Sequence, residues 1–177
     1  MCTVPHHFDR LRAEPVRGPT SEGHQMQAND AGPKLIFPSL GRFYRCLSPY
    51  SYAFMRFSAG AVLVPHGVQK VLFVSASQFA GNIAAQGLPA PLLLAYITFF
   101  TESVAAACLA LGLATRIAAV MIWIEMAVII TTFNGKYGYF WTVRGIEYAL
   151  LWLLLCTAIF FRGGGRYSLD RLIGREF

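Results

Sequence analysis

The stretch from Pro91 to Ala114, PLLLAYITFFTESVAAACLALGLA, constrains the fold more than any other part of the chain. Its only acidic or basic side chain is Glu102, and the other residues are mostly apolar. A helix of this length, at about 1.5 Å per residue, can cross a hydrocarbon core about 30 Å thick. The stretch therefore predicts a membrane-spanning helix. Glu102 lies near its midpoint, where a carboxylate needs a partner, a proton or water.

The composition agrees with a membrane protein. The 177 residues are 55% hydrophobic and 14% charged, and their mean hydropathy is +0.48, which is more apolar than a soluble domain of this size usually is. Lys and Arg exceed Asp and Glu by 15 to 9, but the basic residues flank apolar runs and form no patch with interleaved aromatics. We therefore predict an all-α, polytopic membrane protein and no nucleic-acid partner.

Cysteines and histidines give no sign of a disulfide framework or a metal site. The four cysteines show neither CxxC nor metal-ligand spacing, and we interpret them as small core residues: Cys2, Cys46, Cys108 and Cys156. His6, His7 and His24 lie in the N-terminal segment without a second group of ligands. We expect no bound metal.

Residues 1–49 are expected to form a cytoplasmic tail. Up to about residue 40 the tail mixes Pro, Gly, His and both charges, lacks an apolar block typical of a signal peptide, and is predicted to be disordered. Nothing before Met26 is typical of structure, so Met26 is an alternative start to Met1. The more apolar residues 35–50 are expected to lie at the inner membrane surface.

We predict four membrane-spanning helices within residues 50–162, arranged as an up-down bundle. The expected spans are residues 51–74, 91–113, 116–133 and 142–161. Between the first two, SASQFAGNIAAQGLP predicts a short helix on the membrane surface. Residues 163–177, which open on a glycine triplet, predict a basic amphipathic segment on anionic lipid.

The basic residues predict the orientation of these spans. On one side lie Arg42, Arg45, Arg116, Arg162, Arg166, Arg171 and Arg175, and on the other Lys136, Arg144 and Lys70. Positive charges favour the cytoplasmic side, so both termini are expected in the cytoplasm.

Four polar residues of the spans are predicted to share the outer half of the bundle: His66, Lys70, Glu102 and Glu147. One interpretation is a common polar pocket, because a carboxylate in the bilayer and a nearby basic residue offset each other's desolvation. The alternative treats them separately. Lys70 then extends to the interface, Glu147 pairs locally with Arg144, and His66 binds a backbone carbonyl.

Glu125 lies near the middle of the third expected span and shares a helix face with Met121. Arg56, about two turns inside the first span, is a candidate structural partner for this carboxylate. Glu125 is alternatively a relay residue in transport or catalysis.

No catalytic residue is identified from the sequence, and the chain is not assigned as an enzyme. His66 is the only histidine in an expected span, so a bis-histidine haem is not expected. Phosphate-binding glycine loops, a nucleophile elbow and HExxH are not found either.

Several segments, in order, resemble the DoxX family of small bacterial membrane proteins. They are RFSAGAVLVPHGVQKV, FAGNIAAQGLPAPLLLAY, the Glu102 region with LGLATRIAA, the stretch from Asn134 to Leu151, and GGGRYSLDRL. The resemblance covers about residues 50–173 and implies four transmembrane helices in the cytoplasmic membrane. It also implies that His66, Lys70, Glu102 and Glu147 match the family's polar residues within the spans.

The wider family is associated with quinone-linked sulfur oxidation and with a membrane oxidoreductase complex. Our leading hypothesis is an accessory subunit of a membrane redox system, with an outer-half pocket for a quinone head group or a small anion. The alternatives are a small proton-coupled transporter component and a purely structural assembly factor. Expected partners are the lipid bilayer, membrane redox proteins and, as an option, a second copy of the chain.

Overall fold

The computed structural model describes residues 35–176, and the chain divides into two units, Met1–Pro49 and Tyr50–Phe177. The predicted disorder of the tail falls largely on residues 1–34, which lie outside the described residues, as does the choice between Met1 and Met26. In the first unit, a short 3-10 helix η1 (Pro38–Leu40) leads directly into α2, which starts at Gly41.

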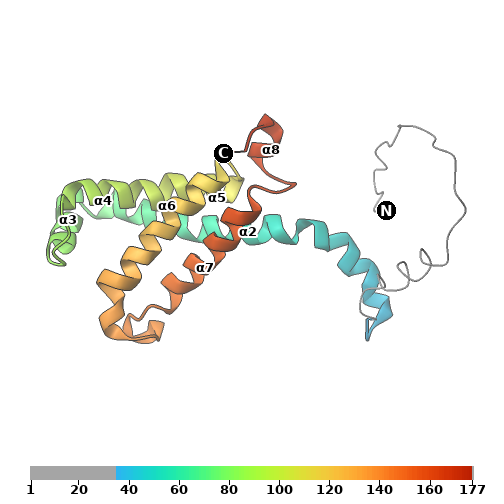
Figure 1. The fold of residues 1–177 in the computed structure, drawn as a ribbon, viewed down its shortest axis with the longest axis horizontal. Helices are drawn as coiled ribbons and strands as arrows, with labels where there is room; N and C mark the ends of the chain where they lie inside the picture. Colours follow the sequence, from blue (N-terminus) through green and yellow to red (C-terminus); the bar gives the residue numbers. More distant parts are fainter. Residues whose placement is uncertain (1–34, 177) are drawn as a thin grey trace, which may run out of the picture. The chain divides into compact units, whose positions relative to one another are not determined.

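The described residues are helical and contain no β-strand, which confirms the all-α prediction (Figure 1). In chain order the elements after η1 are α2 (Gly41–Phe73), α3 (Ala76–Ala84), α4 (Pro91–Phe100), η2 (Thr101–Ala105), α5 (Ala106–Leu111), α6 (Thr115–Val128), η3 (Ile129–Asn134), η4 (Gly135–Tyr137), η5 (Trp141–Val143), α7 (Glu147–Arg162) and α8 (Leu169–Ile173). Two of these elements, η2 and η3, are π-helical and continue α4 and α6 without a break.

Two helices are long and apolar enough to cross a membrane. They run through Pro91–Leu111, with 21 residues and a mean hydropathy of 1.8, and Thr115–Tyr137, with 23 residues and 1.9. A third candidate is the bent pair Pro38–Phe73 and Ala76–Ala84, whose helices meet at 109°. Among the described residues, the structure thus contains two or three candidate spans.

The helix at the fourth expected span is shorter than its predicted range. Residues 142–161 were expected to be helical, but α7 has 16 residues and begins at Glu147. The residues just before it form the 3-10 turn η5, which ends at Arg144 in the left-handed conformation, with φ of 66°. That backbone geometry separates the turn from the helix.

A short helix, α3, is present between the first two expected spans, where the sequence predicted one on the membrane surface. Its N-terminus is a capping box in which the hydroxyl of Ser75 accepts from the backbone N–H of Gln78 at 3.2 Å. The chain leaves α3 through Gly87, whose φ of +76° suits glycine, before Pro91 opens α4.

The core of the second unit is built largely from small side chains on α2, α5, α6 and α7. Buried alanines such as Ala59, Ala106 and Ala119 alternate with a few larger residues such as Leu109 and Ile122. Small residues allow membrane helices to approach closely, because no bulky side chain separates the backbones. α6 and α7 lie side by side (Figure 1).

The C-terminal segment fastens the turn between α5 and α6. α6 starts after Ala114, whose methyl side chain cannot form a hydrogen bond that caps the helix. The carboxylate of Asp170 fills that role, accepting from the backbone N–H groups of Ala114 at 2.6 Å and Thr115 at 2.9 Å, and from the Thr115 hydroxyl at 2.7 Å. Burial would raise the pKa of Asp170, but these hydrogen bonds and the charge of Arg56 outweigh it and hold the pKa below its ordinary value.

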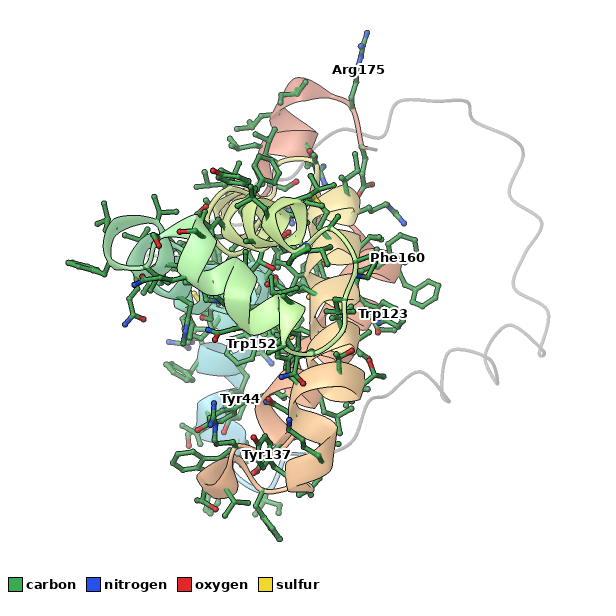
Figure 2. The ribbon with its side chains drawn as sticks, turned by 90° about the vertical axis from the view of Figure 1, so that its left-hand side faces the viewer. Tyr44, Trp123, Tyr137, Trp152, Phe160 and Arg175 are labelled. Carbon is green, nitrogen blue, oxygen red and sulfur yellow. The ribbon has the colours of Figure 1, made fainter. Side chains whose placement is uncertain are left out.

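The two ends of the second unit differ in chemistry. Tyr137 lies at one end and Arg175 at the other (Figure 2). The first end exposes aromatic side chains, including Tyr139 and Trp141, each about half exposed. The other end holds the arginines that follow α7. Aromatic and basic clusters of this kind are typical of the two interfaces of a membrane.

Candidate functional site

The site centres on an ion pair between α2 and the π-helical segment η2. The ammonium nitrogen of Lys70 lies 2.5 Å from each carboxylate oxygen of Glu102. The Glu102 side chain is 5% exposed and that of Lys70 is 24% exposed. The isolated carboxylate of the apolar helix Pro91–Leu111 therefore has its partner in α2.

A glycine and a π-helical turn bring these two side chains together. Gly67 precedes Lys70 by one turn, and a Cβ at Gly67 would lie 2.5 Å from the backbone carbonyl carbon of Glu102. α2 and η2 therefore pack backbone against backbone. η2 widens the helix by one residue, an irregularity that is frequent at functional sites. Ser103, in the same turn, donates its hydroxyl to the carbonyl of Phe99.

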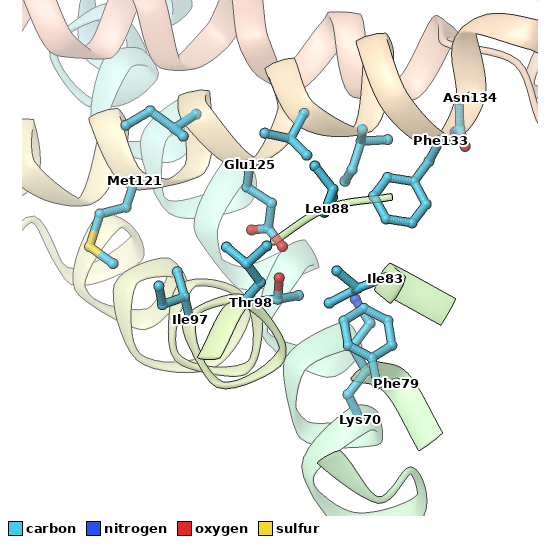
Figure 3. Close-up of a pocket in the computed structure, with 14 residues that line it drawn as sticks. Lys70, Phe79, Ile83, Leu88, Ile97, Thr98, Met121, Glu125, Phe133 and Asn134 are labelled. Atoms are coloured by element: carbon cyan, nitrogen blue, oxygen red, sulfur yellow. The ribbon is translucent and has the colours of Figure 1, made fainter. Parts of the chain in front are cut away.

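Lys70 also forms one wall of a cavity of about 320 Å³ (Figure 3). The other lining residues come from α3 and the loop after it, α4, α6 and η3: Phe79, Ile83, Leu88, Leu94, Ile97, Thr98, Met121, Ile124, Glu125, Val128, Ile129, Phe133 and Asn134. Most are apolar. The Lys70 ammonium lies 5.1 Å from the centre of the Phe79 ring, in cation–π range.

Glu125 is the unsatisfied polar group of this cavity. Both of its carboxylate oxygens are buried, and neither has a hydrogen-bond partner among the described residues. Its side chain points toward Thr98 of α4 (Figure 3). A buried carboxyl without partners is costly, so its persistence in an apolar cavity points to a ligand, a proton or water that completes it.

Of the four residues expected to share a pocket, the structure brings two together. Lys70 and Glu102 are paired, and Lys70 lines the cavity. His66 is exposed and does not line it. Glu147 accepts a hydrogen bond from the backbone N–H of Trp141 at 3.1 Å, which closes the loop before α7. Its contact is therefore local and structural, and it does not line the cavity.

Arg56 and Glu125 do not pair in the described part of the chain. Arg56 is buried and donates to the carbonyls of Leu109 at 2.7 Å and Ala110 at 3.0 Å, which caps the end of α5, and to that of Tyr167 at 2.7 Å. Arg56 is therefore a structural residue of the turn beside Asp170. Glu125 faces the cavity instead.

Phe79, Thr98 and Asn134 line the cavity but were not predicted as site residues from the sequence. One available signal was the spacing of Thr98 and Glu102, which are four residues apart and share a helix face. Asn134 is the last residue of η3. Its side chain donates to the carbonyl of Gly145 at 3.4 Å and lines the cavity at the end of η3.

Comparison with known proteins places the chain in a family. The family model described as DoxX matches residues 52–135, which contain the ion pair and the cavity up to Asn134. An uncharacterized membrane protein of Mycobacterium tuberculosis is 30% identical over 149 residues, which cover 78% of this chain and 91% of that protein. The chain belongs to the DoxX family. It is a membrane protein.

A second relative of the chain comes from another bacterium. An uncharacterized protein of Haemophilus influenzae is 36% identical over 125 residues, which cover 69% of this DoxX chain and 90% of that protein. No solved structure matches the chain.

The arrangement in this DoxX protein suits a ligand with an apolar body and a few hydrogen-bonding groups. Lys70 has three N–H donors, and its contacts with the two Glu102 oxygens leave one for the cavity. Glu125 presents a carboxyl from the opposite wall. The two polar groups are separated by apolar lining, so a bound molecule would be held at its polar ends.

Proposed function

We propose that this DoxX protein binds the head group of a membrane quinone in the cavity between α3, α4, α6 and η3. In this role it is an accessory subunit of a redox system in the bacterial cytoplasmic membrane. The observation that carries the proposal is Glu125, whose buried carboxyl oxygens lack a hydrogen-bond partner among the described residues while Lys70 lies in the same apolar cavity. The quinone oxygens would accept hydrogen bonds from the Lys70 ammonium and from the Glu125 carboxyl in its protonated form.

The charges around the cavity favour a neutral ligand over a small anion. The positive charge of Lys70 is balanced by Glu102 at 2.5 Å, and Glu125 adds a carboxyl to the same cavity. An anion would gain little from a lysine that is already paired and would meet a second acid. A quinone carbonyl needs only a hydrogen-bond donor, which the remaining N–H of Lys70 supplies.

Access from the lipid phase also supports a quinone. Three apolar residues of the cavity wall are exposed at the surface of the structure: Ile97 at 46%, Ile124 at 53% and Val128 at 36%. All three lie on the two helices that are apolar enough to cross a membrane. A ligand dissolved in the bilayer would reach the cavity between these helices without passing through water.

Quinone binding is testable with the purified protein in lipid nanodiscs and decylubiquinone as the probe. Thr98→Phe fills the cavity and is expected to weaken binding at least tenfold. Tyr96→Phe is the matched control, because Tyr96 lies on the same helix, is 58% exposed and does not line the cavity. Equal affinities of Thr98→Phe and the unaltered protein would refute binding in this cavity.

The accessory role has its own test. Purification from native membranes in mild detergent is expected to recover extractable quinone and a membrane oxidoreductase. Recovery of the protein alone, without quinone or a redox partner, would contradict this role.

We further propose that four helices cross the membrane and that both termini are cytoplasmic. In this arrangement α7 is the fourth span; its 16 residues rise about 24 Å, which is less than the roughly 30 Å hydrocarbon core, so the turns at its ends complete the crossing. The support is the separation of the aromatic end from the arginine-rich end of the second unit (Figure 2).

A second candidate function rests on the same unpartnered carboxyl. Glu125 would act as a relay group in a proton-coupled transporter, with Glu102 as the second acid. Proton flux into liposomes would then fall in Glu125→Gln, whereas Tyr96→Phe would retain it. Flux that is equal in both variants would remove this alternative.

A further inference from the structure

A second hollow, of about 400 Å³, lies beyond the end of α7 and plays no part in the proposed quinone site. Four arginines line it: Arg162, Arg166, Arg171 and Arg175. Asp170 and Glu176 are its acidic residues. The hollow therefore gathers cations from α7, the glycine turn and α8 around one space.

The carboxylates of Asp170 and Glu176 bind groups other than the four arginines. Asp170 caps α6 through three hydrogen bonds. Glu176 accepts from the backbone N–H of Gly164 at 2.7 Å and lies 3.7 Å from the Nε atom of Arg116. Neither acid forms an ion pair with the four arginines in the described part of the chain.

Two of the four arginines, Arg162 and Arg166, stack on aromatic rings, and none of the four is neutralised by an ion pair in the described part of the chain. The guanidinium of Arg162 lies 4.4 Å from the ring centre of Tyr52, and that of Arg166 lies 6.0 Å from the ring centre of Tyr167. Such stacking orients a guanidinium without cancelling its charge. Over residues 35–176, no ion pair involves any of the four.

Exposed apolar side chains adjoin these charges. Leu172 is 82% exposed and Ile173 is 60% exposed, and both adjoin Arg171 in α8. Phe161 is 74% exposed beside Arg162. A free phosphate would use only the arginines, whereas a phospholipid presents a phosphate and acyl chains together.

We infer that this hollow is a binding site for the head group of an anionic phospholipid. The guanidiniums of Arg162, Arg166 and Arg171 hold the phosphate, since their planar donors match its oxygens, while Arg175, whose side chain extends outward (Figure 2), adds positive charge nearby. Leu172 and Ile173 lie against the acyl chains. The lipid thereby joins α8 to the end of α7, next to the point where Asp170 fastens α8 to the turn before α6.

The test is native mass spectrometry of the detergent-purified full chain with added phosphatidylglycerol or phosphatidylcholine. Phosphatidylglycerol is expected to bind at least tenfold more tightly. Arg166→Gln/Arg171→Gln should remove most of this preference, by about tenfold or more, while Arg166→Lys/Arg171→Lys retains part of it because the charge remains.

The matched control removes two positive charges from the opposite end, as Lys136→Gln/Arg144→Gln, and should leave the preference unchanged. An equal loss in this control would overturn the inference, because the effect would then follow net charge alone. Equal binding of the two lipids by the unaltered protein would also overturn it. So would displacement of phosphatidylglycerol by millimolar inorganic phosphate, which would identify a site for soluble anions.

Discussion

Lys70 and Glu102 are 32 residues apart in the sequence, and the ammonium nitrogen of one lies 2.5 Å from both carboxylate oxygens of the other. The pair links α2 to the π-helical segment η2 beside the cavity. Such a pair contributes little net stability when intact, because desolvation offsets the attraction. Removing one partner is costly, because it leaves a buried charge.

We therefore expect Lys70→Met to lower the free energy of unfolding by about 3 kcal/mol, because Glu102 then loses its cation. Lys70→Met/Glu102→Leu should cost less than Lys70→Met alone. Reversible unfolding in detergent micelles measures both. Lys136→Met, at an exposed lysine, is the control and should be close to neutral. A double variant as unstable as the sum of its single variants would show that the two residues do not interact.

Two glycines provide a matched test of the close approach between α2 and η2. Gly67→Ala would place a Cβ 2.5 Å from backbone atoms of Glu102 and Ser103, so the helices must separate, and a loss of about 2 kcal/mol or more is expected. Gly81 in α3 has nothing within 4 Å of an added Cβ. Gly81→Ala should be stabilising by about 0.5–1 kcal/mol. Thermal unfolding of both variants is the measurement, and similar shifts would argue against the backbone contact.

The lowered pKa of Asp170 predicts how the free energy of unfolding depends on pH. Its pKa in the folded protein is lowered, so the ionised carboxylate stabilises the fold above the pKa of the unfolded chain, about 4. That contribution is lost as the pH falls through the lower folded-state pKa. Asp170→Asn should lower the free energy of unfolding at neutral pH by about 1–3 kcal/mol and flatten its pH dependence below about 4.

The measurement for Asp170 is a series of unfolding curves between pH 7 and pH 3. Glu176→Gln is the comparison, because that side chain is 42% exposed and should contribute far less. If Asp170→Asn kept the full pH dependence of the unaltered protein, the cap would have no energetic role.

The proposed orientation is testable by cysteine labelling. In a chain whose native cysteines are replaced by alanine, an impermeant maleimide added to intact cells with a permeable outer membrane should label Tyr139→Cys. Leu172→Cys should react only after the cytoplasmic membrane is opened. Both positions are exposed, Tyr139 at 52% and Leu172 at 82%, so accessibility within the protein is not limiting. Labelling of both from outside would contradict cytoplasmic placement of the C-terminal segment.

The sequence was informative where one charge stood alone in an apolar run. Glu102 required a partner, and Lys70, which was expected in the same half of the bundle, is that partner in the structure. His66 was expected in the same half, but it does not line the cavity. His66 and Lys70 are four residues apart, but the contact face of α2 follows Gly60, Leu63, Gly67 and Lys70, and this rotation leaves His66 exposed. Depth alone does not give the rotation of a helix.

Other features of the site depend on irregular backbone geometry, whereas the 3.6-residue spacing used to assign helix faces assumes a regular α-helix. The π-helical segments η2 and η3 change the register of two helices, and no glycine or proline interrupts either segment. The turn at Arg144 likewise shortens α7, and it places the Glu147 carboxylate where it accepts a hydrogen bond from the backbone N–H of Trp141. Periodicity predicted the apolar helices. It did not predict which residues would line the cavity.

The cap that Asp170 supplies has a consequence for biosynthesis. Helix α6 is synthesised more than fifty residues before the side chain that completes its first turn, since Asp170 and Thr115 are 55 positions apart. Both apolar helices, Pro91–Leu111 and Thr115–Tyr137, are therefore synthesised before the residue that caps their connecting turn. The turn between α5 and α6 therefore lacks this cap until Asp170 has been synthesised, and a truncation before Asp170 would leave the start of α6 uncapped.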